Sequence, residues 1–360
     1  MGCSGCELYP NPPQILKQID EAVAAVGPSV DSRGILKRMI NAHYKTLPDP
    51  DQGHRDAVTT TNIWHFRQLL ADHIATHRGR DAGIQALKAI EKSLTCYAAK
   101  LHLNRGANIL KPDRGLNKGY APTFEQLATF GGRMAEAAAW SDLLGTEIRE
   151  KPWVHGLPRM IFVSDMGDAF SSKKHFPFLK REVADSIETK SGKRHLWLWL
   201  TKRPEHMRDF ADSIGGFPAN VCAMTTVTSL ETLHRVDHLR QVDAPCRGLS
   251  IEPLWERLPP RRLDLTGIDW VIVGGESGSG SATQPFHTEW AEELRAHCRK
   301  HNVAFFLKQL GRNPLTAGRT IRLSDPHGGD WDEWPRHLRI REFPTYFHKF
   351  RSSELVIARK

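Results

Sequence analysis

Residues 195–205 read HLWLWLTKRPE, and this stretch decides the fold class. Residues 196–200 form a short, continuously apolar run, which is typical of a strand that is buried on both faces. The polar residues Thr201 to Glu205 follow at once, and a helical pattern begins at Arg203. The stretch therefore predicts a buried strand that ends in polar side chains and leads directly into a helix.

The same unit recurs along the second half of the chain. Helical patterns at 174–189, 203–213, 229–241 and 288–301 alternate with strand candidates at 160–164, 195–200, 220–226, 246–251, 269–274 and 303–308. Buried strands that alternate with helices build a parallel sheet from right-handed βαβ units. About six repeats predict an α/β fold with a TIM-like (βα) barrel, complete or partial. An open doubly wound sheet is the alternative.

Residues 14–150 differ from this region, because they carry helical patterns and no strong strand candidate. Apolar residues recur three and four positions apart in 15–26, 63–74 and 84–94. Loops rich in Pro, Asp and Gly, such as 47–54, separate these stretches. We therefore expect a helical region ahead of the barrel.

The composition limits the class of protein. The chain has 360 residues, with 50 Lys and Arg against 41 Asp and Glu and a net charge of +9. A basic balance favours anionic partners, and nucleic acid is the first of these. No apolar run approaches the roughly 18 residues of a membrane-spanning helix. The N-terminal MGCSGCELYP also lacks the parts of a signal peptide, so we expect a soluble, cytoplasmic protein without a membrane partner.

Polar residues follow each predicted strand, at the ends where barrels and doubly wound sheets carry their chemistry. Asp165 and Asp168 are candidates to receive a ligand's ammonium group or to bind a metal, unless they cap the next helix. Lys202 and Arg203 are candidates to hold a carboxylate or phosphate, unless they begin a solvated helix. These strand ends predict an active-site mouth.

Two further strand ends carry carboxylates and glycines. Glu252 and Glu276 stand where a catalytic carboxylate or a ribose acceptor is placed, and structural bridging explains them equally well. Gly274 and Gly275 begin a glycine-rich loop whose backbone amides could approach a phosphate or an adenosyl group. The loop has neither P-loop nor Rossmann spacing, so on pattern alone it is a flexible loop.

Three of the cysteines form a candidate metal site. Cys3 and Cys6 are a CxxC pair, and Cys96 lies 90 residues further along. Three thiolates can hold a four-iron cluster with one iron open to a ligand, whereas zinc requires a fourth ligand such as His102. The alternative for Cys96 is a buried helical cysteine. The remaining cysteines, Cys222, Cys246 and Cys298, fit buried structural positions.

Basic and aromatic residues interleave in the C-terminal segments 330–343 and 346–351. This pattern suits a path for nucleic acid, in which bases stack on rings and cations follow the phosphates. The alternative, which we favour, is a pair of edge strands that pack their aromatic side chains on the barrel.

Several blocks of the sequence resemble the phage-associated three-Cys-motif proteins, a family treated as related to radical S-adenosylmethionine enzymes. The similar blocks are MGCSGC (1–6), CYA (96–98), NKGY (117–120), WSDL (140–143), KPW (151–153), IFVSDMGD (161–168), LTKRPE (200–205), LSIEP (249–253), WVIVGGESG (270–278) and FFLKQLG (305–311). The resemblance covers most of 96–345, and residues 14–95 look like an insertion between cysteines that usually lie close together.

The resemblance implies a radical-SAM-like partial barrel. Cys3, Cys6 and Cys96 would ligate a 4Fe-4S cluster, and S-adenosylmethionine would occupy its open iron. Reduction would cleave the sulfonium and give a 5′-deoxyadenosyl radical that abstracts hydrogen from the substrate. The implied cofactor-binding residues are Ser164, Asp165, Asp168, Thr226, Gly274 and Gly275, and the implied catalytic residues are Glu252, Glu276 and Lys202. The segment 164–168 would receive the methionine amino group.

Two departures from the family pattern bear on the cluster. The order CxxC, long gap, Cys is not the usual CxxxCxxC of radical-SAM enzymes. Family members also carry a Trp-containing segment ahead of the first cysteine, so either the natural start lies upstream or the ligand pair is on a flexible end.

The first hypothesis is therefore a radical-SAM-like enzyme for the repair or modification of a nucleic-acid base, served by an electron donor such as flavodoxin or ferredoxin. A dedicated partner protein is left open. The alternatives are a zinc-stabilised nucleic-acid-binding protein and a metal-dependent hydrolase or nuclease on the barrel mouth. We divide the chain into a cluster-ligand segment (1–13), a helical insertion (14–95), the barrel (96–311) and a basic, aromatic extension (312–360).

Overall fold

The computed structural model describes residues 10–46, 58–94, 96–105, 110–111, 120–121, 123–125, 128–143, 146–164, 167–277 and 283–355. The chain forms two compact units, and each is described by itself. The first is Met1–Phe130 with Asp165–Asp168, and the second is Gly131–Ser164 with Ala169–Lys360.

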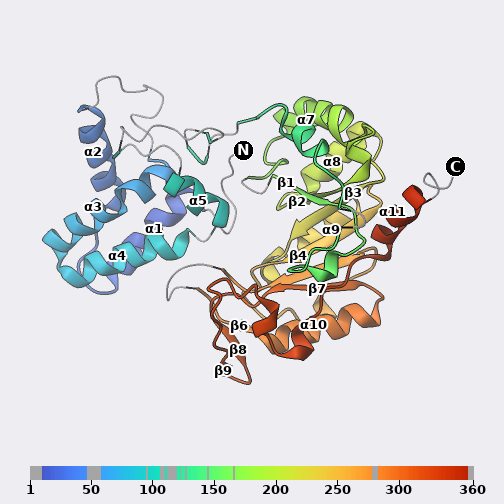
Figure 1. Cartoon of the computed structure of the whole chain (residues 1–360). Coiled ribbons are helices and arrows are strands. Elements are labelled where there is room, and N and C mark those ends of the chain that lie inside the picture. Colours follow the sequence, from blue (N-terminus) through green and yellow to red (C-terminus); the bar gives the residue numbers. More distant parts are fainter. Residues whose placement is uncertain are drawn as a thin grey trace. The chain divides into compact units, whose positions relative to one another are not determined.

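The first unit is helical (blue to cyan in Figure 1). Its helices in the described ranges are α1 (Pro12–Ala24), α2 (Ser32–Tyr44), α3 (Thr60–Arg78), α4 (Arg80–Ser93) and α5 (Tyr97–Arg105). Asn11 caps α1 in a capping box with Gln14, and Asp31 and Thr59 cap α2 and α3. The apolar stripes meet in one core that includes Ile15, Ile19, Leu36, Phe66 and Ile90. The helices expected at 15–26, 63–74 and 84–94 are confirmed as α1, α3 and α4.

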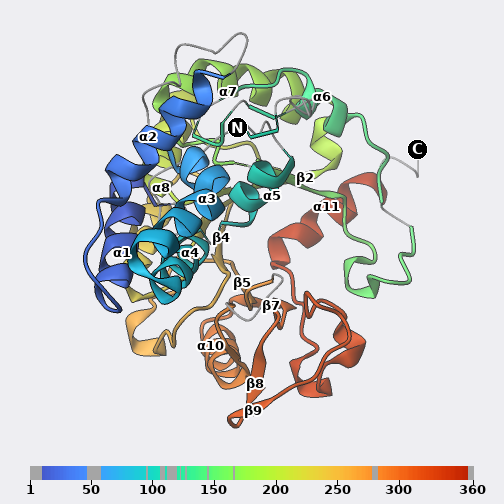
Figure 2. The same cartoon turned by 90° about the vertical axis from the view of Figure 1, so that its left-hand side faces the viewer.

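The second unit is built on a sheet of six parallel strands (Figures 1 and 2). They are β1 (Met160–Val163), β2 (Leu196–Thr201), β3 (Val221–Thr226), β4 (Cys246–Ile251), β5 (Trp270–Gly274) and β7 (Ala304–Gln309). All six predicted strands are confirmed. Their spatial order, β1-β2-β3-β4-β5-β7, follows the chain without a reversal. The sheet therefore curls into a partial TIM-like barrel, and the doubly wound alternative is excluded because that topology reverses its strand order.

The connecting helices cover the outer face of this sheet. They are α7 (Phe176–Glu182), which continues as a π-helical turn over Val183–Ile187, α8 (Pro204–Ile214), α9 (His234–Arg240) and α10 (Thr288–Lys300). On this face Trp199 of β2 stacks on Phe210 of α8, with ring centroids 5.8 Å apart. Right-handed crossovers between neighbouring strands place every such helix on the same face, which leaves the other face as the inside of the barrel.

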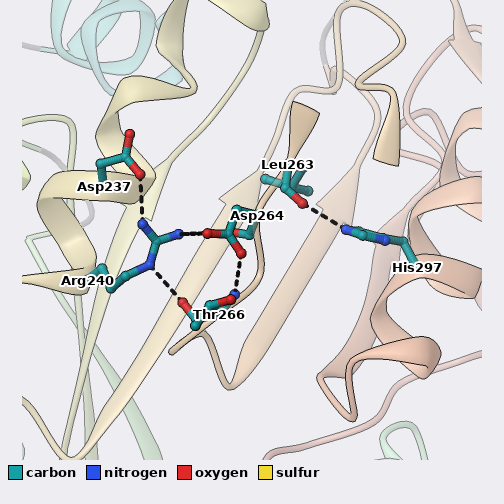
Figure 3. Close-up of polar contacts among 6 residues, drawn as sticks. All are labelled: Asp237, Arg240, Leu263, Asp264, Thr266 and His297. Carbon is teal, nitrogen blue, oxygen red and sulfur yellow. Dashed lines mark hydrogen bonds and ion pairs between the residues drawn. The ribbon is translucent and has the colours of Figure 1, made fainter. Parts of the chain in front are cut away.

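Polar contacts tie the outer helices to the loop that precedes β5 (Figure 3). Arg240 of α9 donates to the Asp264 carboxylate at 3.1 Å and to the Thr266 carbonyl at 2.8 Å. His297 of α10 donates from Nε2 to the Leu263 carbonyl at 2.7 Å. The backbone N–H of Thr266 holds the pKa of Asp264 below its usual range. The loop is therefore fixed to both α9 and α10.

The inner face carries the even-numbered side chains of the strands. Leu198, Cys222 and Cys246 stand side by side in register on β2, β3 and β4, and the same cluster includes Met224 and Trp270. Side chains alternate between the two faces of a strand, so the polar residues with even numbers near the strand ends face the same side.

The C-terminal segment covers the amino-terminal part of this inner face. Residues 345–355 form α11 (Thr345–Leu355), whose Phe347 is fully buried against Trp270. The Tyr346 hydroxyl donates to the carbonyl of Ala219, just ahead of β3. The expected pair of edge strands is wrong, because this part of the chain forms a helix and makes only a single antiparallel bridge, Phe306 with Arg341.

The remaining elements are short. They are α6 (Arg133–Ala138), a small sheet of β6 (Phe286–His287), β8 (Pro314–Thr316) and β9 (Arg319–Thr320), and 3₁₀ turns at Pro152–Val154, Lys173–His175, Gly192–Arg194, Leu230–Thr232, Pro260–Arg262, Trp331–Glu333 and Arg336–Leu338. Within the ranges given above, no helix has the length and apolar character needed to cross a membrane.

Candidate active site at the carboxyl ends of the strands

An ion pair lies on the inner face at the carboxyl ends of β4 and β7. Lys308 Nζ is 2.8 Å from Glu252 Oε1 and 3.1 Å from Oε2. The Glu252 side chain is 18% exposed and that of Lys308 is 52% exposed, so the carboxylate is held while the ammonium group reaches solvent. The sequence predicts Glu252 as a site residue but does not single out Lys308, although Lys308 lies in the polar stretch at the end of the last predicted strand.

Gly274 allows these two side chains to meet across the strand between them. A Cβ atom on Gly274 would lie 3.2 Å from Glu252 Cγ and 3.4 Å from Gln309 Cγ. The Glu252 side chain therefore lies across the bare backbone of β5. A register shift between Val273 and Gly274 accompanies this arrangement, and Gln309 donates from its side chain to the Gly275 carbonyl at 2.9 Å.

Gly275 and Glu276 serve the packing of the neighbouring loops. A Cβ on Gly275 would lie 2.3 Å from the Leu310 carbonyl oxygen, so the two backbones are in direct contact. Glu276 Oε2 accepts from the backbone N–H of Gln284 at 3.2 Å, and its carbonyl accepts from the N–H of Arg312 at 2.9 Å. These contacts show that Glu276 stabilises the loop after β5. Glu252, in contrast, pairs with the Lys308 ammonium group on the inner face.

The ends of β2 and β3 add polar groups. Lys202 follows β2 directly and is half-buried, and Thr226 ends β3 and is buried. The guanidinium of Arg235, from α9, donates to the Thr226 carbonyl at 3.0 Å and is 8% exposed. Arg235 is therefore a buried cation beside the carboxyl end of β3. Nothing in the sequence singled it out, because it occupies an ordinary position in a mixed helix.

The residues after β1 divide between the two units. Ser164, in the second unit, has a φ of 65°, which is rare for a residue with a side chain. Asp168, in the first, is 6% exposed. Asp165 lies outside the described residues. Residues with rare backbone dihedrals are frequent at functional sites, so Ser164 remains a candidate.

Cys96 is the candidate cluster ligand that the structure describes, and Cys3 and Cys6 lie outside the described residues. Cys96 is half-buried against the helical core, and its carbonyl accepts from the N–H of Lys100 at 2.9 Å at the start of α5. His102, on the same helix, is buried, and Nε2 donates to the Ala121 carbonyl at 2.8 Å. Burial lowers the pKa of His102 and keeps its ring neutral, as a metal ligand requires.

The other cysteines are buried, as expected. Cys222 and Cys246 face each other with their sulfurs 3.2 Å apart, and Cys298 lies within α10. Burial raises the pKa of Cys298 to about 12 and that of Cys222 well above its usual value. In the described ranges no three His, Cys, Asp or Glu side chains are grouped as a metal site.

A family model described as "Protein of unknown function (DUF5131)" matches residues 91–335, more than half of the chain. The matched region contains Cys96, the whole parallel sheet and the Glu252–Lys308 pair. Comparison with curated proteins and with solved structures finds no match.

Proposed function

The chain belongs to the DUF5131 family of proteins of unknown function, and from this premise we propose that it is an iron–sulfur enzyme of the radical S-adenosylmethionine type. The observation that carries the proposal is the partial barrel of parallel strands in consecutive order. The ion-paired carboxylate of Glu252 lies on its inner face, at the carboxyl ends of the strands, a place called the inner rim below. This is the architecture that the resemblance to such enzymes implies. Parallel barrels carry their chemistry at this end.

Three thiolates, those of Cys3, Cys6 and Cys96, are the proposed cluster ligands. Cys96 fits this role because it is partly exposed and stands at the start of α5, where the helix dipole favours a thiolate. The deeply buried cysteines of the second unit do not fit. A four-iron cluster with one iron left open supplies electrons and a binding position for S-adenosylmethionine when it is bound.

The inner-rim residues have separate proposed tasks. Glu252, fixed by Lys308, accepts hydrogen bonds from hydroxyl or amino groups of the cofactor or substrate. Lys202 holds an anionic group, and Gly274 keeps the end of β5 free of a side chain. Glu276 positions the loop after β5.

We propose a nucleic-acid base as the substrate, and the net charge of +9 supports this choice. The aromatic C-terminal segment adds less support than its pattern suggests, because Trp334 and Phe347 are buried in the fold. An electron donor such as flavodoxin or ferredoxin is the proposed protein partner.

Anaerobic reconstitution with iron and sulfide tests the cluster. The wild-type chain should become brown, and Cys96→Ala should lose most of its iron. Cys298→Ala is the matched control, because this buried cysteine should leave the iron content unchanged. A Cys96→Ala protein that keeps its full complement of iron, or a colourless protein with one zinc ion, would contradict the cluster and favour the zinc-stabilised alternative.

Release of 5′-deoxyadenosine after reduction tests the activity of the loaded protein. Glu252→Gln should retain iron but lower the yield of this product at least tenfold, because an amide is a weaker acceptor than a carboxylate. No product from a fully loaded wild-type protein would exclude the proposed chemistry. The hydrolase alternative has less support, because Lys308 competes with any metal for the Glu252 carboxylate.

A further inference from the structure

Trp140 presents an unusually open aromatic ring. It lies just after α6 in the second unit and is 47% exposed, more than any other tryptophan in the described ranges. An exposed tryptophan ring offers a large apolar face with a polar N–H, and on a fixed backbone it can stack on a partner at little entropic cost.

The backbone that carries Trp140 is anchored at both ends of α6. The Glu182 carboxylate accepts from the N–H groups of Gly132 and Met134 at the start of the helix. At its end, His195 Nε2 donates to the Ala138 carbonyl at 3.2 Å. His195 is fully buried, and burial lowers its pKa, so the neutral ring acts as this donor. The position of the Trp140 ring is therefore set by the fold.

Two arginines flank the ring. Arg194 donates from Nη2 to the Trp140 carbonyl at 3.2 Å, and Arg159 donates from Nε to the Ser141 carbonyl at 2.8 Å. The Arg159 guanidinium also lies 5.7 Å from the centre of the Trp140 ring. Both arginines are held by uncharged acceptors, and the described part of the chain gives neither an ion-paired carboxylate.

One carboxylate opposes this charge. Asp142 follows in the same loop, where its Oδ1 accepts from the backbone N–H of Leu143, and it lies near enough to His195 to act on its titration. The patch defined by Trp140, Arg159 and Arg194 is therefore cationic and aromatic, with Asp142 at its border.

We propose that this patch binds single-stranded nucleic acid, with a base stacked on Trp140 and the phosphates beside Arg159 and Arg194. A ring on the surface stacks on a base only when the face of that base is free, which favours single strands over a duplex. Guanidinium groups suit phosphates, and the net charge of +9 adds a general attraction. This inference does not depend on the cluster or on radical chemistry.

Fluorescence anisotropy of a fluorescein-labelled twelve-residue thymidine oligonucleotide tests the proposal on the full-length chain, without cofactor. Trp140→Ala should weaken binding about tenfold, because a base loses the ring on which it stacks. Trp140→Phe should retain most of the affinity. Asp142→Asn should tighten binding several-fold, because it removes the opposing charge and keeps the acceptor of Leu143.

Two controls separate this patch from general attraction. Arg319→Ala removes a comparable exposed charge on β9 and should change the affinity less than twofold. Wild-type binding should also fall steeply with salt. Unchanged affinity in a folded Trp140→Ala protein, or equal binding of duplex and single strand, would overturn the proposal. A protein that binds no oligonucleotide at low salt would overturn it as well, whatever the outcome of the iron experiments.

Discussion

Gly274 and Gly275 are neighbours in the chain, but their absent side chains would meet different atoms. A Cβ on Gly274 would meet the flexible side chains of Glu252 and Gln309 at 3.2 Å and 3.4 Å. A Cβ on Gly275 would meet the Leu310 carbonyl at 2.3 Å, and a backbone atom cannot turn aside. A side chain is therefore unfavourable at the two positions for different reasons.

We predict that Gly275→Ala lowers the free energy of unfolding by about 2–3 kcal/mol, because the Leu310 backbone must shift. Gly274→Ala should cost less than about 1 kcal/mol, because Glu252 can turn away. Urea unfolding followed by circular dichroism measures both. Equal losses in the two variants would contradict the assignment of Gly275 to packing and of Gly274 to the inner rim.

The same residues show how far the sequence predicts the site. The strand-end position of Glu252 follows from the apolar run before it, so its place on the rim was predictable. Its pairing with Lys308 was not, because β4 and β7 are separated by β5 and therefore lie about 10 Å apart. Only the absence of a side chain at Gly274 lets Glu252 and Lys308 meet, and that geometry becomes visible only in three dimensions.

At the scale of elements, Arg341 holds the C-terminal segment to the end of β7. Its guanidinium donates to the carbonyls of Leu307 and Lys308, at 3.1 Å and 2.8 Å, and lies 3.8 Å from the centre of the Trp153 ring. Trp334, buried in the same cluster, is 5.0 Å away. Burial lowers the pKa of Arg341 to about 10, which still leaves it charged at neutral pH.

We predict that Arg341→Ala lowers the free energy of unfolding by about 2–3 kcal/mol, through lost hydrogen bonds, lost cation–π contact and a cavity. Arg341→Lys should recover only part of the lost free energy, because an ammonium group lacks the planar guanidinium whose donors reach several carbonyls at once. Arg319→Ala, an exposed substitution, should stay within about 0.5 kcal/mol in the same urea titration. An Arg341→Ala variant as stable as this control would contradict a clamping role.

The prediction of elements succeeded where one physical signal dominated. A strand buried on both faces needs a continuous apolar run, so all six strands of the barrel were predictable. The edge strands predicted in the C-terminal segment are wrong, because alternating aromatic and basic residues also occur in segments that are not strands. In the structure Phe347 and Phe350 lie three positions apart in α11 and belong to the same apolar cluster. The Trp153 and Trp331 rings near Arg341 come from separate 3₁₀ turns.

At the scale of the molecule, the two units have separate cores, and each buries histidines that the fold keeps neutral. His65 and His102 lie in the helical unit and His195 in the barrel unit, and burial lowers the pKa of all three. The largest effect is at His65, whose pKa falls to about 4. Neither ring nitrogen of His65 has a hydrogen bond of good geometry, although the backbone of Leu103 lies beside it.

Acidification should therefore destabilise the helical unit. The folded state keeps His65 neutral while the unfolded chain takes up a proton near pH 6.5, so this contribution to stability is complete above pH 6.5 and declines below it. At pH 5 the loss of stability from His65 amounts to about 2 kcal/mol.

We predict faster amide hydrogen exchange in α3 and α5 at pH 5 than at pH 7, after correction for the intrinsic rates. His65→Leu should remove most of this difference and leave stability at pH 7 intact, because it replaces two unpartnered buried nitrogens with apolar atoms. His77→Leu, an exposed substitution on the same helix, should leave the difference unchanged. A pH response that survives in His65→Leu would show that other groups control the acid stability of this unit.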